Sequence, residues 1–167
     1  MIMRARAWMR RVSEVYFYHL TRQSIDQALR PLLGKCLANG WRVVIRGSEA
    51  VEIHRLDDVL WQGPAEEFLP HGLAGAEQEA DQPVLLALEG HEAPHDCLIC
   101  IGGSAVTADE VLSSKRVCIL FQDDNGLHMQ KARAQWKSLT DAGVAAKYWS
   151  QAQGNWELQA EKAASIA

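Results

Sequence analysis

The stretch "EVYFYHLTRQSIDQALRPLLGKCLANGWRVVIRG", residues 14–47, decides the fold because its hydrophobic pattern changes from that of a strand to that of a helix and back. Residues 14–20 are rich in aromatic and β-branched side chains, which predicts a strand. Ser24 and Gln27 have the spacing of a capping box, so we expect a helix to begin there. Residues 41–47 predict a second strand.

Local signals mark the end of this first helix and the start of a second one. Pro31 inside the first helix predicts a kink or a late start, because proline lacks a backbone N–H, and Gly40 is expected to end the helix. Ser48 is expected to cap a second helix over residues 49–60, whose apolar residues form one stripe. The order strand, helix, strand, helix is typical of an α/β fold with a largely parallel sheet.

The rest of the chain continues the alternation. Continuous apolar runs predict strands that are covered on both faces. The further strands are expected at 83–90, 96–103, 116–122 and 146–152, and further helices from Thr107 with Glu110 and over 125–143. We therefore predict an α/β protein with three layers: a mostly parallel sheet with helices on both faces, Rossmann-like but without a nucleotide site.

No linker divides the chain of 167 residues. We expect a leader over 1–13, one α/β domain over 14–157, and a tail over 158–167 that is a short helix or has no regular structure. The arginine-rich start lacks the apolar region of a secretory signal, and no apolar run approaches the roughly 18 residues that span a bilayer. We therefore expect a cytoplasmic protein.

Charge is divided unevenly along the sequence. Between Ser48 and Glu110 there are fourteen acidic residues and one basic residue, which gives −13, although the whole chain carries only −4. The remainder has sixteen basic and seven acidic residues, which gives +9. This division favours local attraction of charged partners and does not by itself indicate a fold.

Four cysteines lie in apolar segments: Cys36, Cys97, Cys100 and Cys118. Cys97 and Cys100 have CxxC spacing, but side chains alternate along a strand, so these two thiols are expected to face opposite ways. His91 and His95 could join them in a metal site. Two core thiols beside a polar loop are the alternative, and we expect no metal.

The usual catalytic motifs are missing from the sequence. The first turn from strand to helix has no glycine to approach a pyrophosphate, no GxxxxGK[ST] motif occurs, and "IGGSA" at 101–105 lacks a lysine. GxSxG is also missing. His71 with Glu66 and Glu67 could act as acid and base, but nothing nearby provides a nucleophile. We expect no catalytic residue and no cofactor; the alternative is a small α/β enzyme acting on a nucleotide or phosphate ester.

The most unusual stretch is "RLDDVLWQGPAEEFLPHGLAG", residues 55–75, which begins as an amphipathic helix and ends as a loop. Its candidate binding residues are Trp61, Pro64, Phe68, Pro70 and His71. The two aromatics either fold back on the core or form a protein interface, where prolines would limit the entropy lost on docking.

The predicted helix over 125–143 allows two interpretations as well. It is either a solvated helix with one tryptophan facing the core, or a basic pocket with an apolar wall. Lys131, Arg133 and Lys137 bring positive charge, and Trp136 shares a face with Arg133. Such a pocket would suit an acidic peptide with a terminal carboxylate. Direct binding of nucleic acid is a third option, although the patch is small.

These features resemble the chi-subunit family of bacterial DNA polymerase III holoenzyme, an accessory protein of the clamp-loader complex. Residues 55–75 follow the family pattern RLD–x–x–LW–x–x–P–x–E–x–F–x–P–H–x–L–AG closely. Supporting matches are "VYFYHL", "GWRVVI" and "KARAQWKSLTDAG". The resemblance covers roughly residues 14–150, and its central motif is specific.

The resemblance implies a non-catalytic bridge in DNA replication. One surface would bind the psi subunit, which connects to the clamp loader, and here Trp61, Pro64, Phe68, Pro70 and His71 match. Another would bind the acidic C-terminal tail of single-stranded-DNA-binding protein, which ends in Phe. The residues expected there are Arg133 at the tail carboxylate, Trp136 at its phenyl ring, and Lys131, Lys137, Met129 and Gln122 around them. Met129 departs from the family, which can have lysine there. DNA would be met only indirectly.

Overall fold

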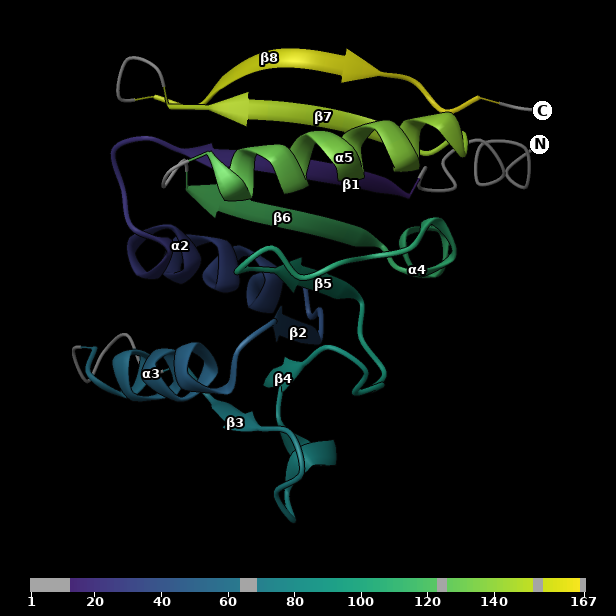
Figure 1. Cartoon of the computed structure of the whole chain (residues 1–167). Helices are drawn as coiled ribbons and strands as arrows, with labels where there is room; N and C mark the ends of the chain where they lie inside the picture. Colours follow the sequence, from purple (N-terminus) through teal and green to yellow (C-terminus); the bar gives the residue numbers. More distant parts are fainter. Residues whose placement is uncertain (1–12, 64–68, 123–125, 152–154, 166–167) are drawn as a thin grey trace.

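The computed structural model describes residues 13–63, 69–122, 126–151 and 155–165, and one sheet runs through them (Figure 1). The sheet has the strand order β3-β4-β2-β5-β6-β1-β7-β8. All neighbouring strands pair in parallel except β7 and β8, which are antiparallel. The predicted α/β class with a mostly parallel sheet is confirmed.

Helices and strands alternate along most of the chain. The strands are β1 (Glu14–Leu20), β2 (Val43–Gly47), β3 (His71–Leu73), β4 (Val84–Leu88), β5 (Cys97–Cys100), β6 (Arg116–Gln122), β7 (Ala145–Ser150) and β8 (Glu157–Lys162). The helices are α2 (Ile25–Ala38), α3 (Ala50–Trp61), the 3-10 turn η2 (Glu79–Asp81), α4 (Ala108–Ser113) and α5 (Leu127–Asp141).

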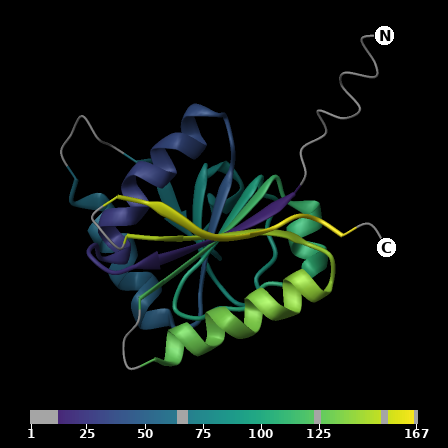
Figure 2. The same cartoon turned by 90° about the horizontal axis from the view of Figure 1, so that it is seen from above.

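Two apolar cores lie on the two faces of the sheet. Leu33 of α2 and Leu56 of α3 are buried in one core, whereas Val111 of α4 and Leu139 of α5 are buried in the other. Viewed from above, α5 lies on the opposite side of the sheet from α2 (Figure 2). The central strands of the sheet are therefore covered by helices on both faces, which explains the continuous apolar runs in their sequences.

The CxxC segment shows this two-faced burial directly. Cys97 belongs to the core under α2 and α3, and Cys100 belongs to the core under α4 and α5. All four cysteines are buried and reduced, and burial raises the pKa of the Cys100 thiol to about 12. Among the described residues no cluster of His, Cys, Asp or Glu is suited to a metal ion.

Helix starts agree with the sequence at two places and differ at a third. Both capping boxes, Ser24 with Gln27 and Thr107 with Glu110, are present. Helix α2 begins directly after Ser24 and continues through Pro31, so of the two predicted alternatives, a kink or a late start, the late start is wrong. The cap by Ser48 is also wrong: its hydroxyl donates to the carbonyl of Gly102 at 2.7 Å, which ties the end of β2 to the turn after β5.

Two strands were not expected from the sequence. β3 forms in the predicted loop and pairs with β4. β8 forms where a short helix or irregular tail was predicted, and it pairs with β7 from Ala146↔Lys162 to Ser150↔Glu157. β7 is consequently not the edge strand that its position in the sequence suggested.

Within the described parts of the chain, no helix is long and apolar enough to cross a membrane.

Candidate protein-binding surfaces

Helix α5 turns its apolar side toward the sheet. Ala132 and Leu139 are buried, and Trp136 is half-buried, with its ring 5.4 Å from that of Phe17 in an edge-to-face arrangement. The Trp136 ring also lies 6.3 Å from that of Tyr148 on β7. Trp136 is therefore part of the packing between α5 and the sheet, with one part left at the surface.

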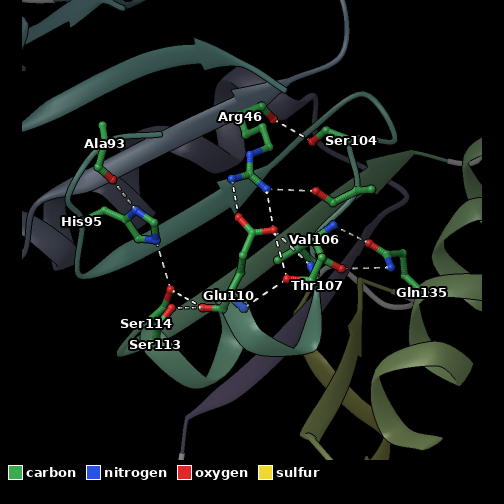
Figure 3. A network of polar contacts seen from close by, with 11 residues as sticks. Arg46, Ala93, His95, Ser104, Val106, Thr107, Glu110, Ser113, Ser114 and Gln135 are labelled. Atoms are coloured by element: carbon green, nitrogen blue, oxygen red, sulfur yellow. Dashed lines mark hydrogen bonds and ion pairs between the residues drawn. The ribbon is translucent and has the colours of Figure 1, made fainter. Parts of the chain in front are cut away.

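A glutamine fixes one flank of α5 to the loop before α4. The side chain of Gln135 accepts from the backbone N–H of Val106 at 2.8 Å and donates to the carbonyl of the same residue at 3.3 Å (Figure 3). This pair of hydrogen bonds imitates a strand pairing, so it fixes the rotation of α5 about its axis. The opposite flank of α5 carries Arg133 and Lys137, which are exposed.

An ion pair between buried Arg46 and partly buried Glu110 holds the same loop and α4 in place (Figure 3). Arg46 on β2 donates to both carboxylate oxygens of Glu110, one at 3.2 Å, and to the carbonyl of Ala105 at 3.0 Å. Hydrogen bonds from Arg46 lower the pKa of Glu110. The hydroxyl of Ser104 donates back to the Arg46 carbonyl at 2.9 Å. The loop that positions α5 is thus anchored in the centre of the sheet.

The three predicted cations of α5 lie on two different flanks of the helix. Arg133, Lys137 and Lys131 are all exposed. Lys131 is two residues from Arg133, about 200° around the helix axis, and its side chain lies against Gly103 of the "IGGSA" turn. Arg133 and Lys137 are four residues apart and share the other flank, where Lys137 pairs with Asp141 at 2.9 Å.

Met129 and Gln122 are also separated, by the sheet itself. Met129 packs on the core beneath α5, and its sulfur lies 3.9 Å from the Tyr148 hydroxyl. Gln122, at the end of β6, donates to the carbonyl of Gln23 at 3.2 Å, at the start of α2. Of the six residues predicted for the tail site, Arg133, Met129 and Trp136 lie along one flank of α5, and Lys137 adjoins them.

The structure adds an aromatic group that sequence patterns did not predict. The rings of His19 and Phe121 are stacked at 4.9 Å, and the Tyr148 hydroxyl lies 3.0 Å from His19 Nδ1. These residues come from three neighbouring strands, β1, β6 and β7. Their proximity depends on sheet order, which sequence spacing does not give.

At the other end of the sheet, Trp61 ends α3 and is 52% exposed. Its ring centroid lies 4.3 Å from that of His71, which is buried. Arg30 of α2 donates to the carbonyls of Val59 at 2.9 Å and Leu60 at 3.3 Å. A cation at the last carbonyls of a helix stabilises its end, so Trp61 projects from a well-fixed helix terminus.

His71 holds the chain on either side of the predicted loop together. Its Nδ1 lies 2.6 Å from the Leu69 carbonyl, and its Nε2 lies 3.2 Å from both the Asp57 carbonyl and Asp57 Oδ1. Both ring nitrogens are thus engaged, and the ring lies beneath Trp61. Pro70, adjacent to His71, is half-buried. Pro64, Phe68, Glu66 and Glu67 lie outside the described residues.

Comparison with known proteins decides the family. Residues 12–147 match the family model of the DNA polymerase III chi subunit, HolC. The chain belongs to the chi-subunit family of DNA polymerase III. It is also 34% identical over 120 residues to DNA polymerase III subunit chi of Escherichia coli (strain K12), covering 72% of this chain and 81% of that protein.

The family match covers the elements that carry both predicted surfaces. These elements are α3, the Trp61 segment and the whole of α5. The match ends within β7, so Trp149 and the whole of β8 follow it.

Proposed function

We propose that this chain is a non-catalytic adaptor in DNA replication, acting as a chi subunit of DNA polymerase III in the cytoplasm. It joins the clamp-loader complex, through a psi subunit, to the C-terminal tail of single-stranded-DNA-binding protein. Family membership supports the replication role. The observation that supports two-partner binding is the wide separation of the two surfaces: Trp61 projects near β3, and Arg133 lies on α5 beside β6 and β7.

The Arg133 flank of α5 is the proposed tail site. Arg133 is exposed and has no ion pair with any residue that the structure describes. A guanidinium suits a terminal carboxylate because it donates two parallel hydrogen bonds. The exposed part of Trp136 offers an apolar contact for the terminal phenyl ring, and Met129 lies two turns away on the same side of α5. Lys137 adds positive charge for the acidic residues that precede the terminus.

The Trp61 surface is the proposed psi site. An exposed tryptophan on a fixed helix end loses little conformational entropy on binding, which is typical of interface anchors. His71 acts there as a support for the Trp61 ring rather than as a contact residue, because it is buried. Pro70 belongs to the same surface, and Pro64 and Phe68 are assigned to it from the family motif.

The alternative, an enzyme of nucleotides or phosphate esters, has weaker support. Lys131 does lie over the glycine turn that lacked a lysine in sequence. However, one lysine over a short turn falls short of the glycine-rich phosphate cradle that a nucleotide site requires. Direct binding of single-stranded DNA is not proposed, because the cations of α5 face two different directions.

The test is a titration with a short acidic peptide that ends in Pro-Phe. We expect micromolar affinity, which is natural for a small interface, and much weaker binding of the same peptide with an amidated terminus. Arg133→Ala should weaken binding at least about tenfold, since a hydrogen bond to a charged group contributes roughly 1.5–3 kcal/mol. Arg55→Ala, which removes an exposed arginine from α3, is the matched control. Equal affinities in Arg133→Ala and wild type would refute the site.

A further inference from the structure

A cavity of about 280 Å³ lies on the face of the sheet opposite α5, between α2 and the C-terminal hairpin. Its walls come from α2, from the strands beneath that helix and from the hairpin. The lining residues are Tyr18, Gln23, Ala28, Pro31, Leu32, Lys35, Leu120, Trp149 and Trp156. None of them belongs to either surface assigned above. The volume is at the lower end of the range for small-molecule sites, roughly 300–1,000 Å³.

Flat aromatic walls define the shape of this cavity. The ring of Trp156 meets that of Tyr18 edge to face at 5.1 Å. Trp149 of β7 lines the same cavity, and its ring lies 6.3 Å from that of Tyr16. Trp156 remains 37% exposed, so the cavity opens to solvent beside it. Aromatic walls of this kind favour a planar apolar group packed against them.

The polar groups of the cavity are mostly donors. Lys35, on α2, is exposed and has no ion pair with a described residue. The indole Nε1 of Trp149 is buried and lacks a hydrogen-bond acceptor within the described parts of the chain. Burial raises the pKa of the Tyr18 hydroxyl, which therefore keeps its proton. Among the described residues no carboxylate lines the cavity, so its charge complements an anion.

We propose that this cavity is a binding site for a small aromatic carboxylate, with the ring between Trp149 and Trp156 and the acid group toward Lys35. The volume accommodates one indole-sized group. The site is separate from the adaptor role proposed above, because none of its lining residues belongs to either of those surfaces. The C-terminal hairpin contributes the two tryptophans, which follow the segment that matches the chi family.

The experiment is calorimetric titration of the full chain with indole-3-acetate, using 3-methylindole and tryptamine as probes that lack the carboxylate or reverse the charge. We expect saturable binding of indole-3-acetate at millimolar concentrations or below, weaker binding of 3-methylindole, and no binding of tryptamine. Trp156→Ala should weaken indole-3-acetate binding about tenfold by removing one wall. Lys35→Gln should weaken it about three- to fivefold, because one exposed ion pair is lost.

Two controls distinguish this cavity from the tail site on α5 and from a groove for a protein terminus. Arg133→Ala should leave indole-3-acetate binding unchanged, whereas it removes the tail binding proposed for α5. A neutral peptide ending in Phe tests whether the occupant is a protein terminus. Binding of that peptide without binding of the free acid would overturn the assignment, as would equal binding of tryptamine, or unchanged affinity in both Trp156→Ala and Lys35→Gln. Circular dichroism of each variant checks the fold.

Discussion

The Trp61 surface and the Arg133 flank of α5 differ in the kind of side chain that each leaves exposed. At the end of α3 the aromatic ring projects into solvent and the titratable ring, His71, is buried beneath it. On α5 the aromatic ring of Trp136 is packed toward the sheet, and the charged group, Arg133, is exposed. The first arrangement favours binding through apolar contact, and the second favours binding through charge. Two partners can then be recognised by different forces without competition.

Truncation of Trp61 should give the largest effect. Trp61→Ala is expected to weaken psi binding by about 2–4 kcal/mol, as for a central interface tryptophan, and to leave tail-peptide binding unchanged. Surface plasmon resonance with immobilised psi measures the first, and the peptide titration measures the second. Val51→Ala, at another exposed apolar position of α3, is the control and should change little. Comparable losses in the two variants would mean that Trp61 is not an anchor.

Loss of the partly buried ion pair between Arg46 and Glu110 should give the next largest effect. Glu110→Gln is expected to lower the free energy of unfolding by about 2 kcal/mol at pH 7, because a charge-assisted hydrogen bond is lost. The pKa of Glu110 is lowered in the folded state, so its contribution is present above its unfolded value of about 4.3 and is lost as pH falls through the folded value. Urea unfolding at several pH values checks this.

The difference between wild type and Glu110→Gln should therefore shrink in acid. Glu52→Gln, in a pair with Arg55 that is more exposed, is the control and should cost less than about 1 kcal/mol. A constant difference for Glu110→Gln from pH 7 to about pH 3 would contradict the assignment to the ion pair.

Salt should distinguish the two surfaces. Raising ionic strength from about 0.05 to 0.5 M should weaken tail-peptide binding several-fold, because exposed charges are screened, while psi binding through Trp61 should change less. Fluorescence anisotropy of labelled partners at a series of NaCl concentrations gives both slopes. If the two affinities depended equally on NaCl concentration, the distinction between a charged surface and an apolar surface would be wrong.

The smallest effect is expected at Lys131. Lys131→Ala should change tail-peptide affinity less than about twofold, because its side chain lies on the flank of α5 away from Arg133. Lys137→Ala, on the same flank as Arg133, should weaken binding slightly more even though Lys137 already pairs with Asp141. The reverse order in the same titration would move the tail site toward the glycine turn.

Sequence patterns predicted most of the fold because the core strands and helices carry strong local signals. Continuous apolar runs indicated β4, β5 and β6, and the two capping boxes indicated the starts of α2 and α4. β8 could not be predicted, since "ELQAEK" has only two apolar residues, Leu158 and Ala160, and all six residues are exposed. Its strand conformation is supported by hydrogen bonds to β7, which depend on tertiary structure.

The candidate sites were predicted less completely, for a geometric reason. Proximity in sequence grouped Lys131 with Arg133, but helical rotation separates them, and strand alternation places Gln122 on the α2 side. The aromatic cavity was missed because its members, from Tyr18 to Trp156, lie far apart in the sequence. Only the sheet order β6-β1-β7-β8 brings them together.

Buried cysteine thiols lie on both faces of the sheet, so their reactivity can report which helix layer separates from the sheet. Cys36, on the inner side of α2, shares the core beneath α2 and α3 with Cys97 and Cys118, and Cys100 belongs to the core beneath α4 and α5. An alkylating reagent reaches none of them until one layer lifts from the sheet, so the rate and order of modification, read by mass spectrometry after proteolysis, would tell which layer separates first.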